Sequence, residues 1–206
     1  MPKTERKKLM TPVGRLNFVA VFNKAKAWDD GGEPQYEVTI VFDAAYLKSH
    51  PDELARYEAI RASLESDCRD MYKKSVKDCV AAIPRFWNPI QDGAVKEHLD
   101  GFGAGKVFFK AKSKRRPGVV GPDKVTPIDD PEAVYSGCYG RLSVTTFAYG
   151  LPAKSSQKGG KGLSILLNSV MFVRDGERLD GGSSNPAEDF GEAPAGEGDD
   201  SADSLL

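Results

Sequence analysis

The 206-residue sequence predicts a mainly β protein with one long helix. Residues 14–22 and 36–43 alternate apolar and polar positions with a period of two, as strands with one buried face do. From Pro51 to about Lys77, apolar residues recur instead every three or four positions, which predicts an amphipathic helix of roughly 25 residues. The 40% hydrophobic content is enough to build a core in a chain of this length.

Turn-rich segments separate these elements from three further strand candidates. The stretch "WDDGGEP" between the first two strands predicts a hairpin-type loop. The prolines and glycines of residues 80–105 predict loops after the helix. Later strands are predicted over "KVFFKAKSKRR" (106–116), over Ala133–Gly150 and over "LSILLNSVMFVRDGERL", which brings the total to about five.

Charge divides the chain into a basic body and an acidic tail. Residues 180–206 contain eight acids and no Lys or Arg, which leaves residues 1–179 with 22 acids and 29 bases. The tail is rich in Gly, Ser and Pro and lacks the apolar surface that would offset its ordering entropy. We therefore predict one folded domain over residues 1–179 and a flexible, disordered tail over residues 180–206.

Catalytic and metal chemistry is poorly represented in this sequence. Two histidines cannot build a multi-histidine metal site, and three widely spaced cysteines without a CxxC pair predict reduced, buried thiols. The stretch "GFGAGK" is one residue too short for a phosphate-binding loop and is followed by Val107 instead of a hydroxyl. We predict no enzyme activity, no catalytic residue, no metal and no cofactor. A metal-dependent nuclease or recombination enzyme stays open as an alternative, because Asp29/Asp30 and Asp129/Asp130 form carboxylate pairs.

Hydropathy gives no sign of a membrane protein. No apolar run approaches the roughly 18 residues of a membrane span, and the first residues lack the apolar core of a signal peptide. We therefore expect a cytoplasmic protein that makes no contact with a membrane.

Two of the predicted strands carry aromatic and basic side chains opposite their core face. In the stretch 106–116, Val107, Phe109 and Ala111 share one face, and the other face is aromatic and positive. Single-stranded nucleic acid requires this combination, since unpaired bases stack on flat rings and cations neutralise the phosphates. The predicted stacking residues are Phe108, Tyr135, Tyr139, Phe147 and Tyr149. The predicted phosphate contacts are Lys106, Lys110, Lys112, Lys114, Arg115, Arg116, Arg141, Lys154, Lys158 and Lys161.

An alternative interpretation of the same pattern is structural. The rings could pack beneath the helix, because a sheet covered on both faces also shows two apolar sides. Trp28 and Trp87 are weaker binding candidates, since each lies in a turn-rich segment. Stacking and phosphate contacts also serve RNA, so an RNA-binding regulator stays open.

Five strands, one helix, an aromatic and basic face and long loops are together typical of an OB-type barrel. The chain resembles the phage single-stranded-DNA-binding protein family of the Enterobacter-phage type in "FFKAKSKRRPGVV", "YSGCYGRLSVTTFAY", "KGLSILLNSVMFVRDGERLDGG" and the acidic end. The resemblance implies an OB fold and sequence-independent binding of single-stranded DNA in replication, recombination and repair. It also implies that the tail contacts replication or recombination proteins, although "DSADSLL" lacks the final aromatic residue common on such tails. A homodimer is left open.

Overall fold

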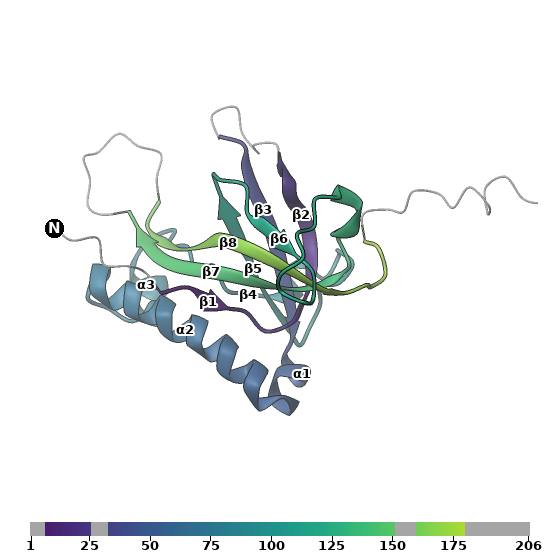
Figure 1. Cartoon of the computed structure of the whole chain (residues 1–206). Helices are drawn as coiled ribbons and strands as arrows, with labels where there is room; N and C mark the ends of the chain where they lie inside the picture. The colour runs from purple at the N-terminus through teal and green to yellow at the C-terminus, as the bar shows by residue number, and fades with distance from the viewer. Residues whose placement is uncertain (1–6, 26–32, 151–159, 180–206) are drawn as a thin grey trace, which may run out of the picture.

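The computed structural model describes residues 7–25, 33–150 and 160–179 (Figure 1). Its elements are β1 (Leu9–Met10), β2 (Gly14–Ala25), β3 (Gln35–Asp43), α1 (Ala44–Ser49), α2 (Pro51–Tyr72), α3 (Val76–Ala82), β4 (Gln91–Asp92), the 3-10 turn η1 (Gly93–Lys96), β5 (Lys106–Ser113), β6 (Gly118–Val120), the 3-10 turn η2 (Pro131–Ala133), β7 (Tyr139–Tyr149) and β8 (Gly162–Arg174).

Five of the strands close into a barrel. They are hydrogen-bonded in the order β7, β2, β3, β5, β8, and β8 pairs with β7 to complete the ring. The β5–β8 pair is parallel, and the other pairs of the ring are antiparallel. The short strands β1, β4 and β6 extend this sheet at its margins. The OB-like barrel of five strands that the sequence predicts is therefore confirmed.

Every strand of the ring contributes at least one fully buried apolar side chain to the barrel interior. Examples in ring order are Leu142, Leu16, Ile40, Phe109 and Ile165. On β5 the predicted alternation is confirmed, because Phe109 and Ala111 are buried in this core and their neighbours point outward.

Helix α2 lies along one side of the barrel, next to β1 and β7 (Figure 1). Its buried residues Tyr57, Ile60, Leu64 and Cys68 recur at helical spacing, as predicted. The helix ends at Tyr72, earlier than predicted, because Lys73 adopts a left-handed conformation with φ 57° and caps it.

Several predicted strand boundaries are wrong; the last strand, for example, was predicted to reach Leu179 but ends at Arg174. The strand predicted from Ala133 begins at Tyr139, because η2 and a tight turn precede it. Gly137 in that turn has φ 116°, and a Cβ there would lie 1.9 Å from the carbonyl oxygen of Glu177. The strand predicted to Arg116 ends at Ser113.

The three cysteines are buried and reduced, as predicted. The Sγ atoms of Cys68 and Cys79 lie 3.4 Å apart between α2 and α3. Burial, together with the neighbouring thiol, raises the pKa of Cys68 to about 12.

Within the described ranges, no helix is long and apolar enough to cross a membrane. Among the same residues, no three His, Cys, Asp or Glu side chains gather as a metal site would require. Asp129 pairs with Arg116, and the Asp130 carboxylate accepts from the Glu132 N–H, whereas Asp29 and Asp30 lie outside the described residues.

Candidate nucleic-acid interface

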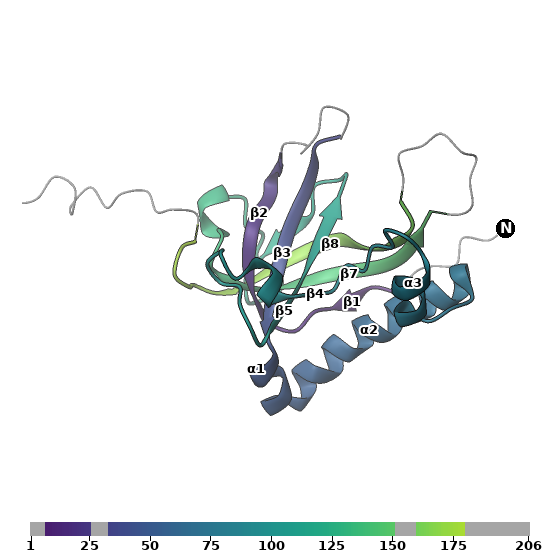
Figure 2. The same cartoon turned by 180° about the vertical axis from the view of Figure 1, so that it is seen from behind.

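A groove of about 580 Å³ crosses the outer face of the barrel over β3, β5 and β8. The segment before β4 forms one wall: the Trp87 N–H donates to the Lys161 carbonyl, and the Trp87 carbonyl accepts from the Leu163 N–H, both at 2.9 Å. The lining also includes Val95 and Lys96 of η1, which directly follows β4 at the edge of β5 (Figure 2). The residues that line the groove are Thr39, Trp87, Pro89, Gln91, Val95, Lys96, Phe108, Lys110, Lys112, Tyr149, Ser164 and Ile165.

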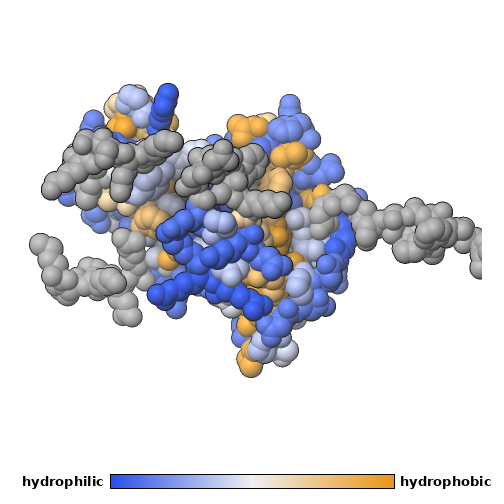
Figure 3. Space-filling view, turned by 90° about the horizontal axis from the view of Figure 1, so that it is seen from above, coloured by the Kyte–Doolittle hydropathy of each residue, from blue (hydrophilic) through white to orange (hydrophobic). Residues whose placement is uncertain are grey.

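The groove combines exposed apolar side chains with lysines. Trp87 is 53% exposed and Val95 is 61% exposed, so both present apolar surface to the groove. The barrel seen from above shows hydrophilic side chains gathered centrally, with hydrophobic side chains beside them (Figure 3).

A cluster of three phenylalanines lies beneath Lys96 at the edge of the groove. The Lys96 Nζ is 5.2 Å from the ring centroids of both Phe18 and Phe108 and 5.5 Å from that of Phe102. Burial lowers the pKa of Lys96, and nearby Lys110 lowers it further. Lys96 thus places a half-buried cation on aromatic rings at the edge of the groove.

Phe18 points outward because β2 is bulged. The pairing of β2 with β3 shifts register between Asn17 and Ala20, and Phe18 has φ 49°. Leu16 and Val21 are buried in the core, whereas the intervening Phe18 is 45% exposed. The simple alternation of the sequence, which places Leu16 and Phe18 on one face, is wrong at this bulge.

A buried carboxylate already pairs the two groove lysines of β5. Glu37 on β3 accepts from Lys110 Nζ at 2.6 Å, and its other oxygen lies 3.7 Å from Lys112 Nζ. Glu37 lies directly opposite Lys112 in the sheet. Any phosphate that enters here competes with this carboxylate.

The structure brings four of the predicted residues into the groove, namely Phe108, Lys110, Lys112 and Tyr149. Phe108 is only 6% exposed, so its ring forms part of the groove floor beneath Lys96 and is not open for a base to stack on it. Lys161 lies at the rim through its backbone bond to Trp87.

The cations that follow β5 lie outside the groove lining. Lys114 pairs with Glu33 at 2.5 Å, and Arg116 pairs with Asp129 at 3.4 Å and covers the Phe22 ring. The Arg115 N–H donates to the Ser113 hydroxyl. Lys154, Lys158 and Trp28 lie outside the described residues.

Arg141 lies on a different face of the barrel, against α2. Its guanidinium contacts both carboxylate oxygens of Glu53 at 2.9 and 2.5 Å and donates to the Thr11 carbonyl at 3.1 Å. Burial would raise the pKa of Glu53, but hydrogen bonds from Arg141 and the Val13 N–H outweigh it and lower the pKa. For Arg141 the structural alternative therefore holds: its side chain packs against α2 and does not line the groove.

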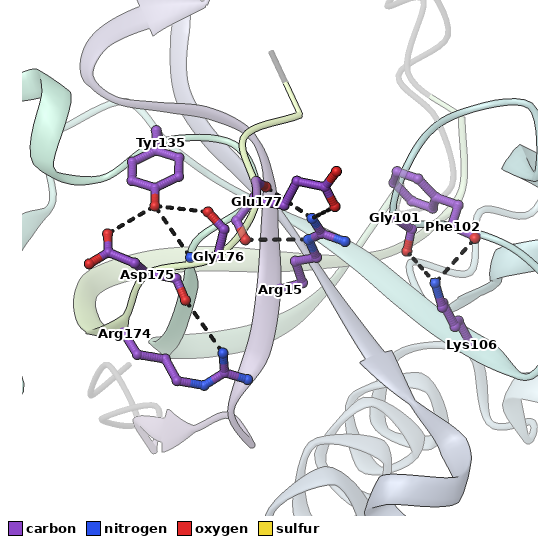
Figure 4. Close-up of polar contacts among 10 residues, drawn as sticks. Arg15, Gly101, Phe102, Lys106, Tyr135, Arg174, Asp175, Gly176 and Glu177 are labelled. Carbon is purple, nitrogen blue, oxygen red and sulfur yellow. Dashed lines mark hydrogen bonds and ion pairs between the residues drawn. The ribbon is translucent and has the colours of Figure 1, made fainter. Parts of the chain in front are cut away.

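The other predicted aromatics and Lys106 also lie away from the groove lining. The Tyr135 hydroxyl contacts Asp175 at 2.9 Å and the Gly176 carbonyl at 3.0 Å, and Lys106 donates to the carbonyls of Gly101 and Phe102 (Figure 4). The Arg174 guanidinium lies 3.5 Å from the Tyr139 ring centroid. Phe147 lies half-buried on β7.

Trp87, a weaker candidate in the sequence, lines the groove together with Lys96, which was not predicted, and Phe18, also not predicted, lies at its edge. Trp87 and Lys96 lie in segments without periodicity, and their places depend on the pairing of residues 87–92 with β5 and β8. The signal available in the sequence was the tryptophan itself, in a segment flanked by prolines.

The model of the family described as Enterobacter phage Enc34, ssDNA-binding protein, matches residues 7–204. The chain belongs to this family. Membership of the Enc34 family, a family of binding proteins, agrees with the prediction that the protein is not an enzyme.

Individual relatives of the Enc34-family chain are distant. Protein p50 of Acyrthosiphon pisum secondary endosymbiont phage 1 is 34% identical over 101 residues, which is 49% of this chain and 50% of p50. The chain thus spans about half the length of this curated relative.

Solved structures share the fold of this Enc34-family chain. The single-stranded DNA-binding protein of bacteriophage Enc34 in complex with ssDNA superimposes with a TM-score of 0.63 at 20% identity, over 82% of this chain and 88% of that one. The single-stranded DNA-binding protein gp2.5 of bacteriophage T7 gives a TM-score of 0.53 at 16% identity, over 94% and 100%.

Proposed function

We propose that this protein binds single-stranded DNA in the groove over β3, β5 and β8, without sequence preference, during phage replication, recombination and repair in the host cytoplasm. OB folds bind oligonucleotides on their second and third strands and on the loops after strands one and four. In this barrel those strands are β3 and β5, and the connections from β2 to β3 and from β7 to β8 lie largely outside the described residues. The observation that carries the proposal is the exposed aromatic and basic lining of this groove.

The groove offers both parts of the chemistry that a single strand requires. Bases would stack on Trp87 and Phe18, at about 1–3 kcal/mol per base, and every base has a flat face for this contact. Lys96, Lys110 and Lys112 would contact the intervening phosphates. Because these contacts involve no base edge, they support binding without sequence preference.

We further propose that residues 1–179 are the DNA-binding domain and that the acidic residues 180–206 compete with DNA and recruit replication or recombination proteins. Leu179, the last described residue, lines the same small cavity as Phe18, so the acidic segment starts beside the groove. Truncation after Leu179 should tighten binding most at low salt and abolish partner binding. Equal affinities of full-length and truncated protein at low salt would contradict the competition.

The function is tested by titrating the full chain with a fluorescent oligonucleotide as single-stranded DNA, duplex DNA or RNA, with magnesium and with chelator. If about five phosphates are neutralised, log K should fall with log salt at a slope of about −3.5 for single strands. Equal or tighter binding of RNA would favour the RNA-binding regulator, and magnesium-dependent cleavage would favour the nuclease. If the affinity does not change with salt concentration, the proposal that basic residues of the groove bind phosphates is refuted.

A further inference from the structure

A second basic pocket lies at the other ends of β7 and β8 from the groove. Its volume is about 540 Å³. Arg15 stands near the start of β2, Lys106 and Tyr139 are the first residues of β5 and β7, and Arg174 is the last residue of β8. The groove, in contrast, uses Phe108, Lys110 and Lys112 of β5, the end of β7 and the start of β8.

The cations of this second pocket are oriented mainly by backbone carbonyls. Lys106 Nζ donates to the carbonyls of Gly101 at 3.1 Å and Phe102 at 3.3 Å (Figure 4). Arg174 lies over the Tyr139 ring and contacts the Asp175 carbonyl at 3.4 Å. Within the described part of the chain, neither cation has a carboxylate partner within ion-pair distance, so both charges remain available to an anion.

Arg15 supports the same pocket and is more firmly held. It donates to the carbonyls of Gly137 at 3.3 Å and Glu177 at 2.9 Å, and the Glu177 carboxylate, 3.6 Å away, is 86% exposed. The carboxylate that lines the pocket is Asp43, which accepts from the N–H groups at the start of α1. Three cations against one lining carboxylate give the pocket a positive balance, unlike the groove lysines that share Glu37.

A row of cross-strand neighbours connects the two sites around the barrel. Phe108 lies opposite Val41, Val41 opposite Arg15, Arg15 opposite Tyr139, and Tyr139 opposite Arg174. Four spacings of about 4.8 Å separate the ends of this row by roughly 19 Å along the curved sheet. A strand that leaves the groove near Phe108 therefore has a short path to the second pocket.

We propose that the second pocket binds phosphates of the same DNA strand after it leaves the groove, so that long oligonucleotides contact two sites and short ones contact only the groove. This inference rests on the proposed function. The Tyr139 ring fixes the plane of the Arg174 guanidinium, whose N–H edge can hold a phosphate through two parallel bonds. Lys106, the first residue of β5, adds a point charge to the lining of the pocket.

The test compares wild type with the double variant Lys106→Gln/Arg174→Gln on oligonucleotides of about 8 and about 30 nucleotides, the shorter within the range of one OB fold. The control is Arg61→Gln/Arg69→Gln on α2, which removes the same charge from exposed helix positions. We expect the double variant to bind the short strand within about twofold of wild type and the long strand about tenfold more weakly. Its salt slope on the long strand should be smaller by about 1.4, the value for two phosphates.

The possible results separate this inference from the proposed function. If wild type binds both lengths and the double variant weakens neither, or weakens both equally, the second contact is refuted while the groove stands. If wild type binds no single strand, the proposed function falls and this inference falls with it. A gain in short-strand affinity that disappears on truncation after Leu179 would assign the pocket to the chain's own acidic segment and overturn the proposal. Thermal unfolding of the variants checks that they remain folded.

Discussion

Replacing Glu37 by Gln should tighten the binding of single-stranded DNA. The side chain of Glu37 is 10% exposed and contacts Lys110 at 2.6 Å and Lys112 at 3.7 Å, so it occupies the two groove lysines as a phosphate would. Glutamine keeps the shape and one acceptor oxygen for Lys110 but removes the charge. DNA would then meet two uncommitted lysines in place of an ion-paired cluster.

The size of the effect follows from the two contacts. Ion pairs near a protein surface contribute about 0.2–1 kcal/mol each, so breaking both costs a phosphate about 0.4–2 kcal/mol. Since about 1.4 kcal/mol corresponds to a factor of ten, Glu37→Gln should bind about 2–30-fold more tightly at low salt. One additional neutralised phosphate would make the salt slope steeper by about 0.7.

Fluorescence anisotropy with a labelled short oligonucleotide, at several salt concentrations, measures both quantities. The matched control is Glu33→Gln, which removes an equal charge from the exposed pair with Lys114 and should change the affinity less than about twofold. Unchanged or weaker binding by Glu37→Gln would show that Glu37 positions the lysines instead of competing with phosphates.

Three further results are expected. Trp87→Ala should lose about 1–3 kcal/mol of binding while its melting temperature stays near that of wild type, because the ring is 53% exposed. Phe108→Ala should lower the free energy of unfolding by about 3 kcal/mol, measured by urea titration, because that ring is buried against Val41 and Phe102. The pKa of Glu53 is lowered in the folded protein, so its contribution to stability is present above pH 4.5 and is lost as the pH falls through the lower folded value. Melting temperatures measured from pH 6 to pH 3 should show this loss in wild type and not in a Glu53→Gln variant.

Period-two patterns predicted the faces of β5 correctly because that strand pairs with β3 without interruption. All eight residues of β5 have consecutive partners on β3, so inward and outward positions alternate along its whole length. The core of the barrel and the positions of Lys110 and Lys112 were therefore accessible from the sequence alone.

Two physical causes limited the rest of the prediction. A bulge on β2 shifts the register by which faces are assigned, and one inserted residue moves every later side chain to the opposite face. The position of the Arg141 side chain depends on its contact with Glu53, 88 residues away on α2. No local sequence pattern encodes where a helix packs on a barrel. The groove walls at Trp87 and Lys96 likewise come from irregular segments placed by tertiary pairing.

Phe18 offers a way to separate stability from binding. A non-glycine residue in the left-handed conformation costs roughly 1–2 kcal/mol, and such residues occur at helix ends, as Lys73 does, as well as at functional sites. Phe18→Gly removes this strain but also the ring contacts with Phe102 and Lys96, so the two effects should offset each other within about 1 kcal/mol.

If the exposed ring of Phe18 stacks on a base, the same change should weaken single-strand binding by about 1–3 kcal/mol. Lys73→Gly is the matched control, because Lys73 has a similar φ of 57° at the end of α2 and does not line the groove. It should gain stability and leave affinity unchanged. Urea unfolding and oligonucleotide titration of both variants decide the matter: a large loss of stability in Phe18→Gly with wild-type affinity would mean that the bulge serves packing, and the strained residue would then have no part in binding.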